Sequence, residues 1–370
     1  MTGAQLEIQL IAVIVAIACA LPGVFLVLRK MAMMSDAIGH AILFGIVLAF
    51  FVVHDVASPL LIVAAALTGL LTVVMVESLH RTRLVREDAA IGLVFPLLFS
   101  IGVILISRYA GDIHLDVDAV LLGELAFAPF DRLVWDGYDL GPRAAYMMSA
   151  ILVLNIVFIA LFYKELKFAS FDAGMAAAAG FSPVLIHYSL MSLVSLTAVG
   201  AFDAVGAVLV VALMIAPPAA AYLITNRLSR MLVISAIIAV FSAISGYWLA
   251  NLLDVNIAGS MATMTGVVFG LVLFFAPYRG LIAIAQRKAR QRIEFAQKML
   301  AVHLLNHQGK PEERERECHV RDVHEHLRWE KEFAGKITRI SQREGLLAID
   351  NNIMTLTSTG LALAEKSMVE

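Results

Sequence analysis

Cysteine is nearly missing from this chain, which has two in 370 residues, Cys19 and Cys318. Because Cys19 lies in an apolar run and Cys318 in a polar one, the two do not indicate a disulfide framework. Charged residues make up only 16% of the chain, whereas soluble domains carry about 25%. With 60% hydrophobic residues and a mean hydropathy of +0.84, this composition excludes an ordinary soluble domain and predicts an integral membrane protein.

Signatures of catalysis are also missing. The sequence has no Gly-x-x-x-x-Gly-Lys-Ser/Thr phosphate loop, so we expect no ATP hydrolysis by the chain itself. His324-Glu325-His326 lacks the spacing of zinc-protease ligands, and no pair of Cys-x-x-Cys motifs occurs. The net charge of −2 points to no class of partner. Positive charge follows the first apolar run, at Arg29 and Lys30, so we expect no cleaved signal peptide.

Long apolar runs are what the chain has in quantity. Runs of about 20 apolar residues are long enough to cross a bilayer as helices. The sequence offers nine of them, at 6–28, 35–53, 57–78, 89–107, 144–163, 183–201, 204–225, 231–251 and 257–277. Lys and Arg gather in alternate loops, which predicts that the N-terminus lies outside and the C-terminus inside. The short break at Phe202-Asp203 leaves eight crossings plus a re-entrant piece open as an alternative.

The composition changes at about residue 286, where charges of both signs interleave. We predict a basic linker over 281–292, followed by helices over 293–308, 320–327, 331–344 and 359–366. The alternation over 346–357, with Asp350-Asn351-Asn352 as its turn, predicts a β-hairpin. Three helices followed by a two-stranded wing are typical of a winged helix. The predicted fold class is therefore an all-α polytopic membrane protein with about eight or nine spans and a small cytoplasmic α+β winged-helix domain over 293–370.

Asp36 and His40 stand one helical turn apart inside the second apolar run. Positions i and i+4 share a helix face, so the carboxylate and the imidazole can hold one divalent cation together. A charged side chain inside the bilayer costs about 2.5–3.5 kcal/mol on insertion scales, which favours a place on a pathway, a partner or an ion. The alternative interpretation puts Asp36 near the interface in a salt bridge to Arg29 or Lys30, with His40 as a satisfied interior histidine.

Two long stretches resemble the ABC-3 family of permeases, the membrane subunits of manganese, zinc and iron ABC importers. Residues Met34–Gly45 resemble the signature of that family's second helix, and Val205–Ala221 resemble its other long signature. Asp118–Glu124 resembles the family's outer loop, where Phe usually stands before the glycine. Together the resemblances cover residues 1–280, the expected permease domain.

A further stretch resembles the cytoplasmic loop through which these permeases dock on their ATPase. It consists of Lys164–Leu166 and Phe171–Ala176, although the family usually carries acidic residues where this chain has Ala173 and Gly174. The resemblance implies that Phe171, Asp172, Gly174 and Met175 contact the ATPase, with Phe171 and Met175 one turn apart on one short helix. A plain amphipathic connector at the membrane surface is the alternative.

The family resemblance implies a function for the chain. It would be the permease of an ATP-driven importer of divalent transition metals in a bacterial inner membrane, with no permanently bound cofactor. Asp36 and His40 would line the path and coordinate the metal, Mn²⁺ first and Zn²⁺ or Fe²⁺ next, because the path offers oxygen and no cysteine. Its partners would be a separate cytoplasmic ATP-binding subunit, an extracytoplasmic metal-binding protein and a second permease subunit. An ion-coupled secondary metal transporter and a membrane-anchored regulator stay open as alternatives.

Acidic residues in the long segment 108–143 suggest a funnel at the outer mouth. Asp112, Asp116 and Asp118 alternate with His114 at every second position, so the four would share a face in an extended strand, where their field would concentrate cations. The candidate funnel residues are Asp112, His114, Asp116, Asp118 and Glu124. An ordinary solvated acidic loop is the preferred interpretation.

The tail has a resemblance of its own. Ile337–Leu347 and Met354–Ala364 resemble the winged-helix part of iron-dependent repressors of the diphtheria-toxin-repressor type. Those repressors' separate metal-sensing domain is absent here, so their metal ligands cannot be carried over. Acids nearly equal bases in the tail, which favours a docking or regulatory domain over nucleic-acid binding.

The tail also concentrates histidine. His303 and His307 stand at i and i+4, and Cys318, His319, His324 and His326 follow. These residues raise a cytoplasmic metal site as a hypothesis. The preferred interpretation is a solvated helix face and linker, because no closed zinc spacing occurs.

Overall fold

The structure is a computed structural model that describes residues 3–54, 58–109, 125–135, 138–309 and 311–369. The chain divides into two compact units, Met1–Gly280 (unit 1) and Leu281–Glu370 (unit 2). In the described parts of unit 1 the long helices are α1 (Gly3–Leu28), α2 (Met33–Val53), α3 (Pro59–Arg81), α4 (Glu87–Tyr109), α6 (Arg143–Leu161), α9 (Pro183–Val205), α10 (Ala207–Ile224), α11 (Leu228–Leu253) and α12 (Ile257–Phe275).

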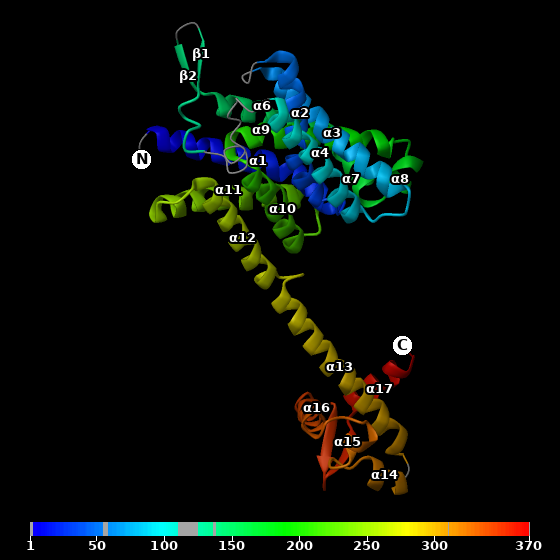
Figure 1. The fold of residues 1–370 in the computed structure, drawn as a ribbon. Coiled ribbons are helices and arrows are strands. Elements are labelled where there is room, and N and C mark those ends of the chain that lie inside the picture. The colour runs from blue at the N-terminus through cyan, green and yellow to red at the C-terminus, as the bar shows by residue number, and fades with distance from the viewer. Residues whose placement is uncertain (1–2, 55–57, 110–124, 136–137, 310, 370) are drawn as a thin grey trace. The chain divides into compact units, whose positions relative to one another are not determined.

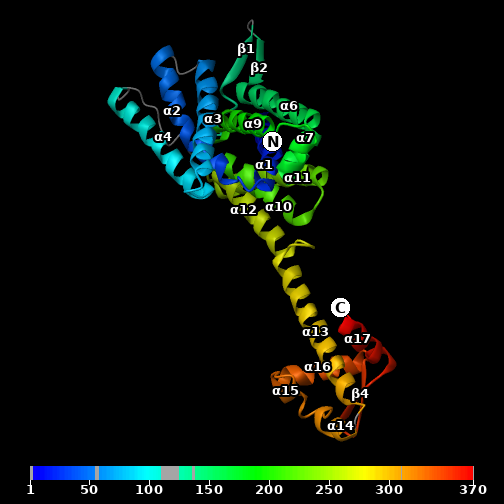
Figure 2. The same cartoon turned by 90° about the vertical axis from the view of Figure 1, so that its right-hand side faces the viewer.

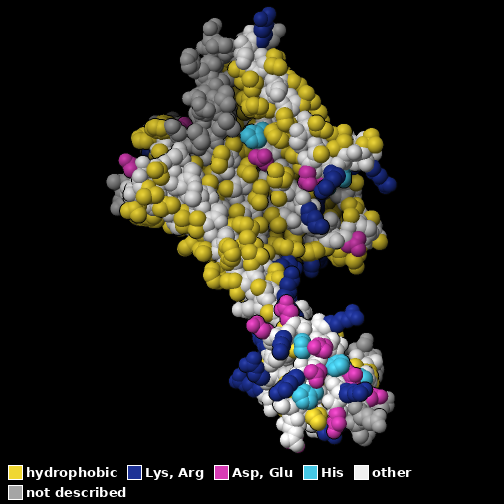
Figure 3. All heavy atoms as spheres, turned by 60° about the horizontal axis from the view of Figure 1, so that its bottom comes forward, with side chains coloured by type: hydrophobic (Ala, Val, Ile, Leu, Met, Phe, Trp, Pro, Cys, Tyr) yellow, Lys and Arg dark blue, Asp and Glu magenta, His cyan; other side chains and the backbone are white. Residues whose placement is uncertain are grey.

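Nine helices among the described residues are long and apolar enough to cross a membrane. They coincide with the nine apolar runs of the sequence to within a few residues at each end. The prediction of a mostly helical polytopic membrane protein is therefore confirmed. Apolar side chains cover the face of unit 1 in Figure 3, as expected for a lipid-facing surface. Val52, Leu67 and Ile104, for example, are 76%, 61% and 64% exposed.

Helix α1 forms the centre of unit 1. It packs against α6, α9, α10 and α11, and its Val15, Val24 and Phe25 are fully buried. The close approach to α10 needs a residue without a side chain, because a Cβ on Gly23 would clash with the carbonyl oxygen of Met214. Helix α2 packs on both α3 and α4 in a neighbouring group (Figure 2).

One buried polar contact ties three helices together without charge. The Asn155 amide of α6 donates to the carbonyl oxygen of Ala18 in α1 at 2.9 Å and lies 3.1 Å from the Thr197 hydroxyl of α9. Asn155 and Thr197 are both fully buried. Buried amides need such partners, since an unpaired one would cost about 1–3 kcal/mol.

The break between α9 and α10 differs from the prediction. Helix α9 continues through Phe202 and Asp203 to Val205, and the chain turns at Gly206, where φ is 80° and ψ is 162°. Only glycine adopts this conformation without strain, which is the signal that locates the break. Helix α10 then runs on through Pro217 and Pro218.

A hairpin of β1 (Arg132–Trp135) and β2 (Tyr138–Pro142) precedes α6 and was not predicted. Arg132 Nε lies 2.5 Å from Asp139 Oδ2, and its Nη2 lies 3.4 Å from Glu7 Oε1 at the start of α1. The hydrogen bond from Arg132 lowers the pKa of the Asp139 carboxyl. Charges of opposite sign across the strands are a signal for pairing, but the acidic composition of 108–143 concealed it.

Two short helices follow α6 in unit 1. They are α7 (Tyr163–Phe171) and α8 (Ala173–Ala178), and they end at the loop before α9. Leu166 is fully buried, and α7 packs on α1 and α9.

Unit 2 has the predicted helices and hairpin in the predicted order, with one further helix over Pro311–Glu317 that was not predicted. Its elements are α13 (Leu281–His307), α14 (Pro311–Glu317), α15 (Val323–His326), α16 (Lys331–Arg343), β3 (Leu347–Asp350), β4 (Ile353–Leu356) and α17 (Ser358–Val369). Residues 281–292 differ from the prediction, because they form the first part of α13 instead of a linker. They contain good helix formers and no glycine or proline, so their charge alone misled the prediction.

A separate apolar core holds unit 2 together. Leu300 and Leu304 of α13 pack with Ile337 of α16 and with Leu347 and Met354 of the hairpin. The turn between β3 and β4 is Asn351-Asn352, with φ of 49° and 65°, as two-residue hairpin turns require. The winged-helix assignment of this arrangement stays a prediction.

Candidate functional site

Asp36 and His40 lie in the first two turns of α2. The helix begins at Met33, so the Asp36 carboxylate stands in the first turn, where the helix dipole favours negative charge. His40 Nε2 is 3.5 Å from Asp36 Oδ1, and the two side chains are 32% and 33% exposed. The predicted pair is therefore formed, and it opens toward the surface of unit 1.

Aromatic rings from α4 fix the imidazole of His40. The ring of Phe95 stacks on it with centroids 5.6 Å apart, and Phe99 meets it edge-on at 6.1 Å. The other side of the helix fits closely against α9, because a Cβ on Gly39 would clash with the ring of Phe202. The imidazole of His40 is thus held by two rings of α4, on a helix that packs closely against α9.

Among the described residues Asp36 forms its ion pair with His40, and neither of its alternative partners, Arg29 and Lys30, pairs with it. Arg29 directs Nη1 to His187 Nδ1 at 3.1 Å and Nε to the Ser170 hydroxyl at 3.2 Å. Arg29 therefore does not form a salt bridge with Asp36.

His40 stands seven residues after Met33, which places it about 10 Å into the helix at 1.5 Å per residue.

The donor set of the pair is small. Among the described residues, no third His, Cys, Asp or Glu joins Asp36 and His40 in a group with metal-ligand spacing. One carboxylate and one imidazole leave most of a transition metal's coordination positions to water or to groups from another chain. Such an arrangement can bind an ion and let it go again.

A polar network missed by sequence reasoning lies where α3 ends and α9 begins. Glu77 of α3 places Oε1 2.5 Å from His187 Nε2, and its Oε2 accepts the Tyr188 hydroxyl at 2.6 Å. Through Arg29 this network reaches Ser170 on α7. Burial lowers the pKa of the Arg29 guanidinium to about 10, a value still high enough for the group to be charged at neutral pH. The signal in the sequence was one acid, Glu77, near the end of an apolar run.

The predicted docking residues lie on two helices instead of one. Asp172 ends α7 in an extended conformation and caps α8, its Oδ1 accepting the amide N–H of Met175 at 2.9 Å. Phe171 and Met175 are 61% and 58% exposed, so both present apolar surface. Gly174 lies in the first turn of α8. The capping Asp172 is the reason that one helix became two.

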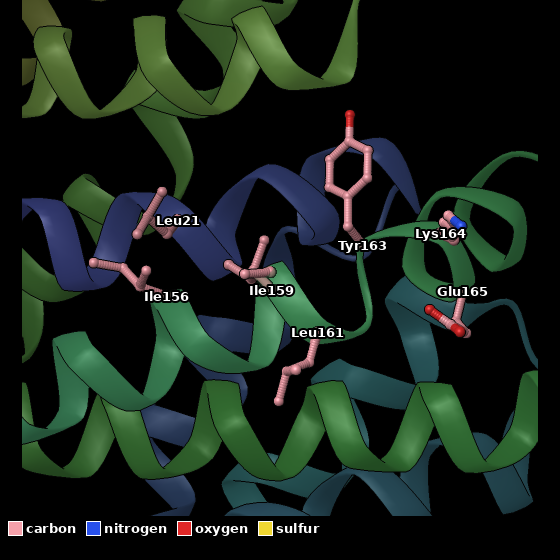
Figure 4. A pocket seen from close by; sticks show the side chains of 8 residues that line it. Leu21, Ile156, Ile159, Leu161, Tyr163, Lys164 and Glu165 are labelled. Atoms are coloured by element: carbon pink, nitrogen blue, oxygen red, sulfur yellow. The ribbon is translucent and has the colours of Figure 1, made fainter.

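A groove of about 640 Å³ lies next to this segment. In Figure 4, Leu21 of α1 faces Ile156 and Ile159 of α6, and Tyr163, Lys164 and Glu165 belong to α7. Its lining is mainly apolar and includes neither Asp36 nor His40. Nothing in it resembles a metal site.

The predicted outer funnel falls outside the described residues. This applies to Asp112, His114, Asp116, Asp118 and Glu124. Their role stays a prediction.

Comparisons with known proteins agree with the fold. A model of the ABC 3 transport family matches residues 5–278. The chain is 46% identical to the zinc transport system membrane protein TroD of Treponema pallidum, over 97% of this chain and 98% of that protein. It is 49% identical to the manganese transport system membrane protein MntD of Bacillus subtilis, over 77% of this chain and 96% of that protein.

A solved structure is also similar. PsaBC from Streptococcus pneumoniae, in complex with Fab, superimposes with a TM-score of 0.62 and 27% identity, over 75% of this chain and 94% of that chain. The similarity to TroD extends through unit 2, whereas the match to the family model ends at residue 278.

Proposed function

The chain belongs to the ABC 3 transport family, and from this premise we propose that it carries Mn²⁺, in preference to Zn²⁺ or Fe²⁺, through an ATP-driven importer. Membership makes it a permease of metal ABC importers. Its relatives are named for zinc and for manganese, so the metal is assigned from donor chemistry. A carboxylate oxygen and an imidazole nitrogen without cysteine suit Mn²⁺, although Zn²⁺ and Fe²⁺ use the same donors.

The Asp36–His40 pair is the transit site in this proposal. What supports it is a carboxylate and an imidazole held 3.5 Å apart, one-third exposed, on a helix that is otherwise apolar. A charged side chain left facing lipid would be costly, so a second permease subunit is expected to cover it. The partner's equivalent pair would complete the ligands. A shared site of few protein donors releases its ion readily when the subunits move apart.

Two further partners and an orientation complete the proposal. The Lys- and Arg-rich loops lie in the cytoplasm, with the N-terminus outside the bacterial inner membrane and unit 2 inside. An extracytoplasmic binding protein delivers the metal to the acidic outer segment. A separate ATPase docks on Phe171, Asp172, Gly174 and Met175. The exposed apolar side chains of Phe171 and Met175 would be buried in that contact. Unit 2 serves as a winged-helix docking or regulatory domain and does not bind nucleic acid.

The polar network at Glu77 connects the ATPase-docking helix α7 with the helices that position the Asp36–His40 pair, so it can transmit a movement of α7 to that pair. Movement of α7 would act on Arg29 through Ser170, and on α3 through His187 and Glu77. Helix α3 packs directly on α2, which carries Asp36 and His40. A hydrogen-bonded chain of this kind transmits displacement because breaking it would leave charges without partners.

Uptake by reconstituted vesicles tests the proposal. The chain is inserted with its ATPase and binding protein, and ATP-dependent uptake of Mn²⁺, Zn²⁺ and Fe²⁺ is measured. Asp36→Ala with His40→Ala should abolish uptake while the ATPase remains bound. The matched control is His80→Ala with Asp88→Ala, which removes the same residue types from the last turn of α3 and the first turn of α4. Uptake that survives the first double substitution in an intact complex would overturn the proposal.

A further inference from the structure

Three histidines and two glutamates converge in unit 2, apart from the transport site. His303 and His307 lie one turn apart on α13 with ring centroids 4.8 Å apart, and the His326 ring of α15 stacks on His303 at 5.8 Å. Glu313 and Glu317 come from α14. Segments separated by up to 23 positions, from His303 to His326, thus deliver their donors to one place.

The donors are close enough to share an ion. Ligand atoms of His303, His307 and Glu317 all lie within 4.8 Å of one another. His326 Nδ1 is 2.9 Å from Glu317 Oε2, and His307 Nδ1 is 3.0 Å from Glu313 Oε2. A cation could replace the proton in each of these nitrogen–oxygen contacts, because metal binding releases protons from its ligands.

The folded core holds the cluster in place. Leu300 and Leu304, adjacent to the histidines on α13, are buried in the core of unit 2. The Cys318 carbonyl oxygen, next to Glu317, accepts the Met354 amide of the hairpin at 2.9 Å. The Glu317 carbonyl oxygen lies 3.0 Å from His303 Nε2. These contacts fix α13 against the end of α14, so the donors do not depend on an unstructured tail.

Ring proximity sets three histidines of unit 2 apart from the others. His303 has the rings of His307 and His326 as neighbours, with centroids 4.8 and 5.8 Å away. The other histidines of unit 2 have different partners: His324 Nδ1 lies 2.7 Å from the Arg321 carbonyl oxygen, and His319 Nδ1 lies 3.8 Å from Asp322. Histidine side chains stand among acidic ones on the face of unit 2 in Figure 3.

We propose that His303, His307, His326, Glu313 and Glu317 form a binding site for a divalent first-row transition metal ion. Imidazole nitrogen with carboxylate oxygen is the donor set that such ions take in proteins. The ion joins α13 to α14 and α15, and so restrains the segment between His307 and His326. Unlike the transport pair, the site has enough ligands within one chain to retain its ion.

Metal binding to the full chain in detergent micelles tests this proposal, with Co²⁺ and Zn²⁺ as probes. All proteins carry Asp36→Ala and His40→Ala, so the transport pair contributes nothing and the test is independent of uptake. Equilibrium dialysis should find one ion per chain, and bound Co²⁺ should give the intense visible absorption of a four- or five-coordinate site. Adding His307→Gln or Glu317→Gln should weaken binding at least about tenfold, because loss even of a residue that only orients a ligand costs about 10–100-fold in metal affinity. Adding His324→Gln, the matched control, should leave binding unchanged.

Trypsin provides a second measurement. Arg314 and Arg316 are exposed on α14, so bound Zn²⁺ should slow cleavage there in the parent protein but not in the Glu317→Gln variant. If His307→Gln fails to fold, the Glu317→Gln variant still decides the matter. Equal binding by the Glu317→Gln and His324→Gln proteins, or no binding by the parent, would overturn the site.

Discussion

Unit 1 holds its candidate metal donors as a pair, whereas unit 2 gathers five donors from three helices. Asp36 and His40 neighbour each other on one helix face and are one-third exposed. In unit 2, ligand atoms of His303, His307 and Glu317 lie within 4.8 Å of one another, and the contact of Glu317 with His326 brings α15 into the proposed cluster. Both sites use carboxylate and imidazole donors, and their side chains are similarly exposed, so the difference between them lies in the number of donors and of helices that supply them.

This difference matches what each site is proposed to do. An ion in transit must leave on every cycle, which a site with two donors per chain permits. An ion that stabilises or regulates a domain must stay, which needs more donors. The number of ligands therefore distinguishes a site that releases its ion from a site that keeps it more clearly than the type of ligand does.

The largest expected effect comes from Asp36→Asn. The side chain keeps its size but loses the charge that a divalent ion needs, so initial uptake should fall at least about 100-fold. The measurement is ATP-dependent Mn²⁺ uptake by vesicles, with ATP hydrolysis followed in the same sample. An unchanged uptake rate would remove Asp36 from the pathway.

The next effect concerns the ATPase surface. Phe171→Ala with Met175→Ala removes two exposed apolar groups, and retention of the ATPase during purification should fall about tenfold or more. Leu84→Ala is the matched control, since Leu84 is 88% exposed in the loop between α3 and α4. Equal loss in both proteins would show that α7 and α8 have no special part in docking.

Glu77→Ala tests the enclosed polar network of unit 1. Losing the hydrogen bond that this carboxylate accepts from the Tyr188 hydroxyl, together with its ion pair with His187, should lower the unfolding free energy by about 2–3 kcal/mol. Thermal unfolding in micelles, followed by circular dichroism, measures the change. A midpoint equal to that of the parent would mean that the network does not hold α3 to α9.

The smallest effect is expected from Glu294→Ala in unit 2. Glu294 pairs with Arg290 at 2.7 Å on α13, but the two side chains are 52% and 83% exposed. Exposed i,i+4 pairs contribute only about 0.3–0.5 kcal/mol. The same measurement should therefore show a much larger loss of unfolding free energy for Glu77→Ala than for Glu294→Ala. Similar losses in the two variants would contradict the contrast between enclosed and exposed ion pairs.

Much of the fold could be predicted because apolar runs and helix periodicity are local signals. The nine spans and the hairpin at Asn351-Asn352 belong to this class, as does the pairing of Asp36 with His40 at i and i+4. What could not be predicted depends on distant contacts. Glu77 and His187 lie 110 positions apart, and nothing in either run indicates the other.

The cluster of unit 2 illustrates the same limit. Sequence spacing placed His303 beside His307, but it did not select His326 over His319 and His324, which are closer in sequence to Cys318. That choice depends on where α14 and α15 turn back on α13. Asp172 gives an opposite example, since its capping role could have been read from the sequence and would have divided the docking helix correctly.

The central claim is that unit 1 passes metal and unit 2 retains it. One vesicle preparation tests it, with Mn²⁺ uptake driven by ATP and the metal left on the protein measured after external ions are removed. We predict that Asp36→Ala with His40→Ala abolishes uptake but keeps the retained ion. His307→Gln with Glu317→Gln should lose the retained ion but still transport. If both properties disappear together in either protein, the two sites are not separate and the account is wrong.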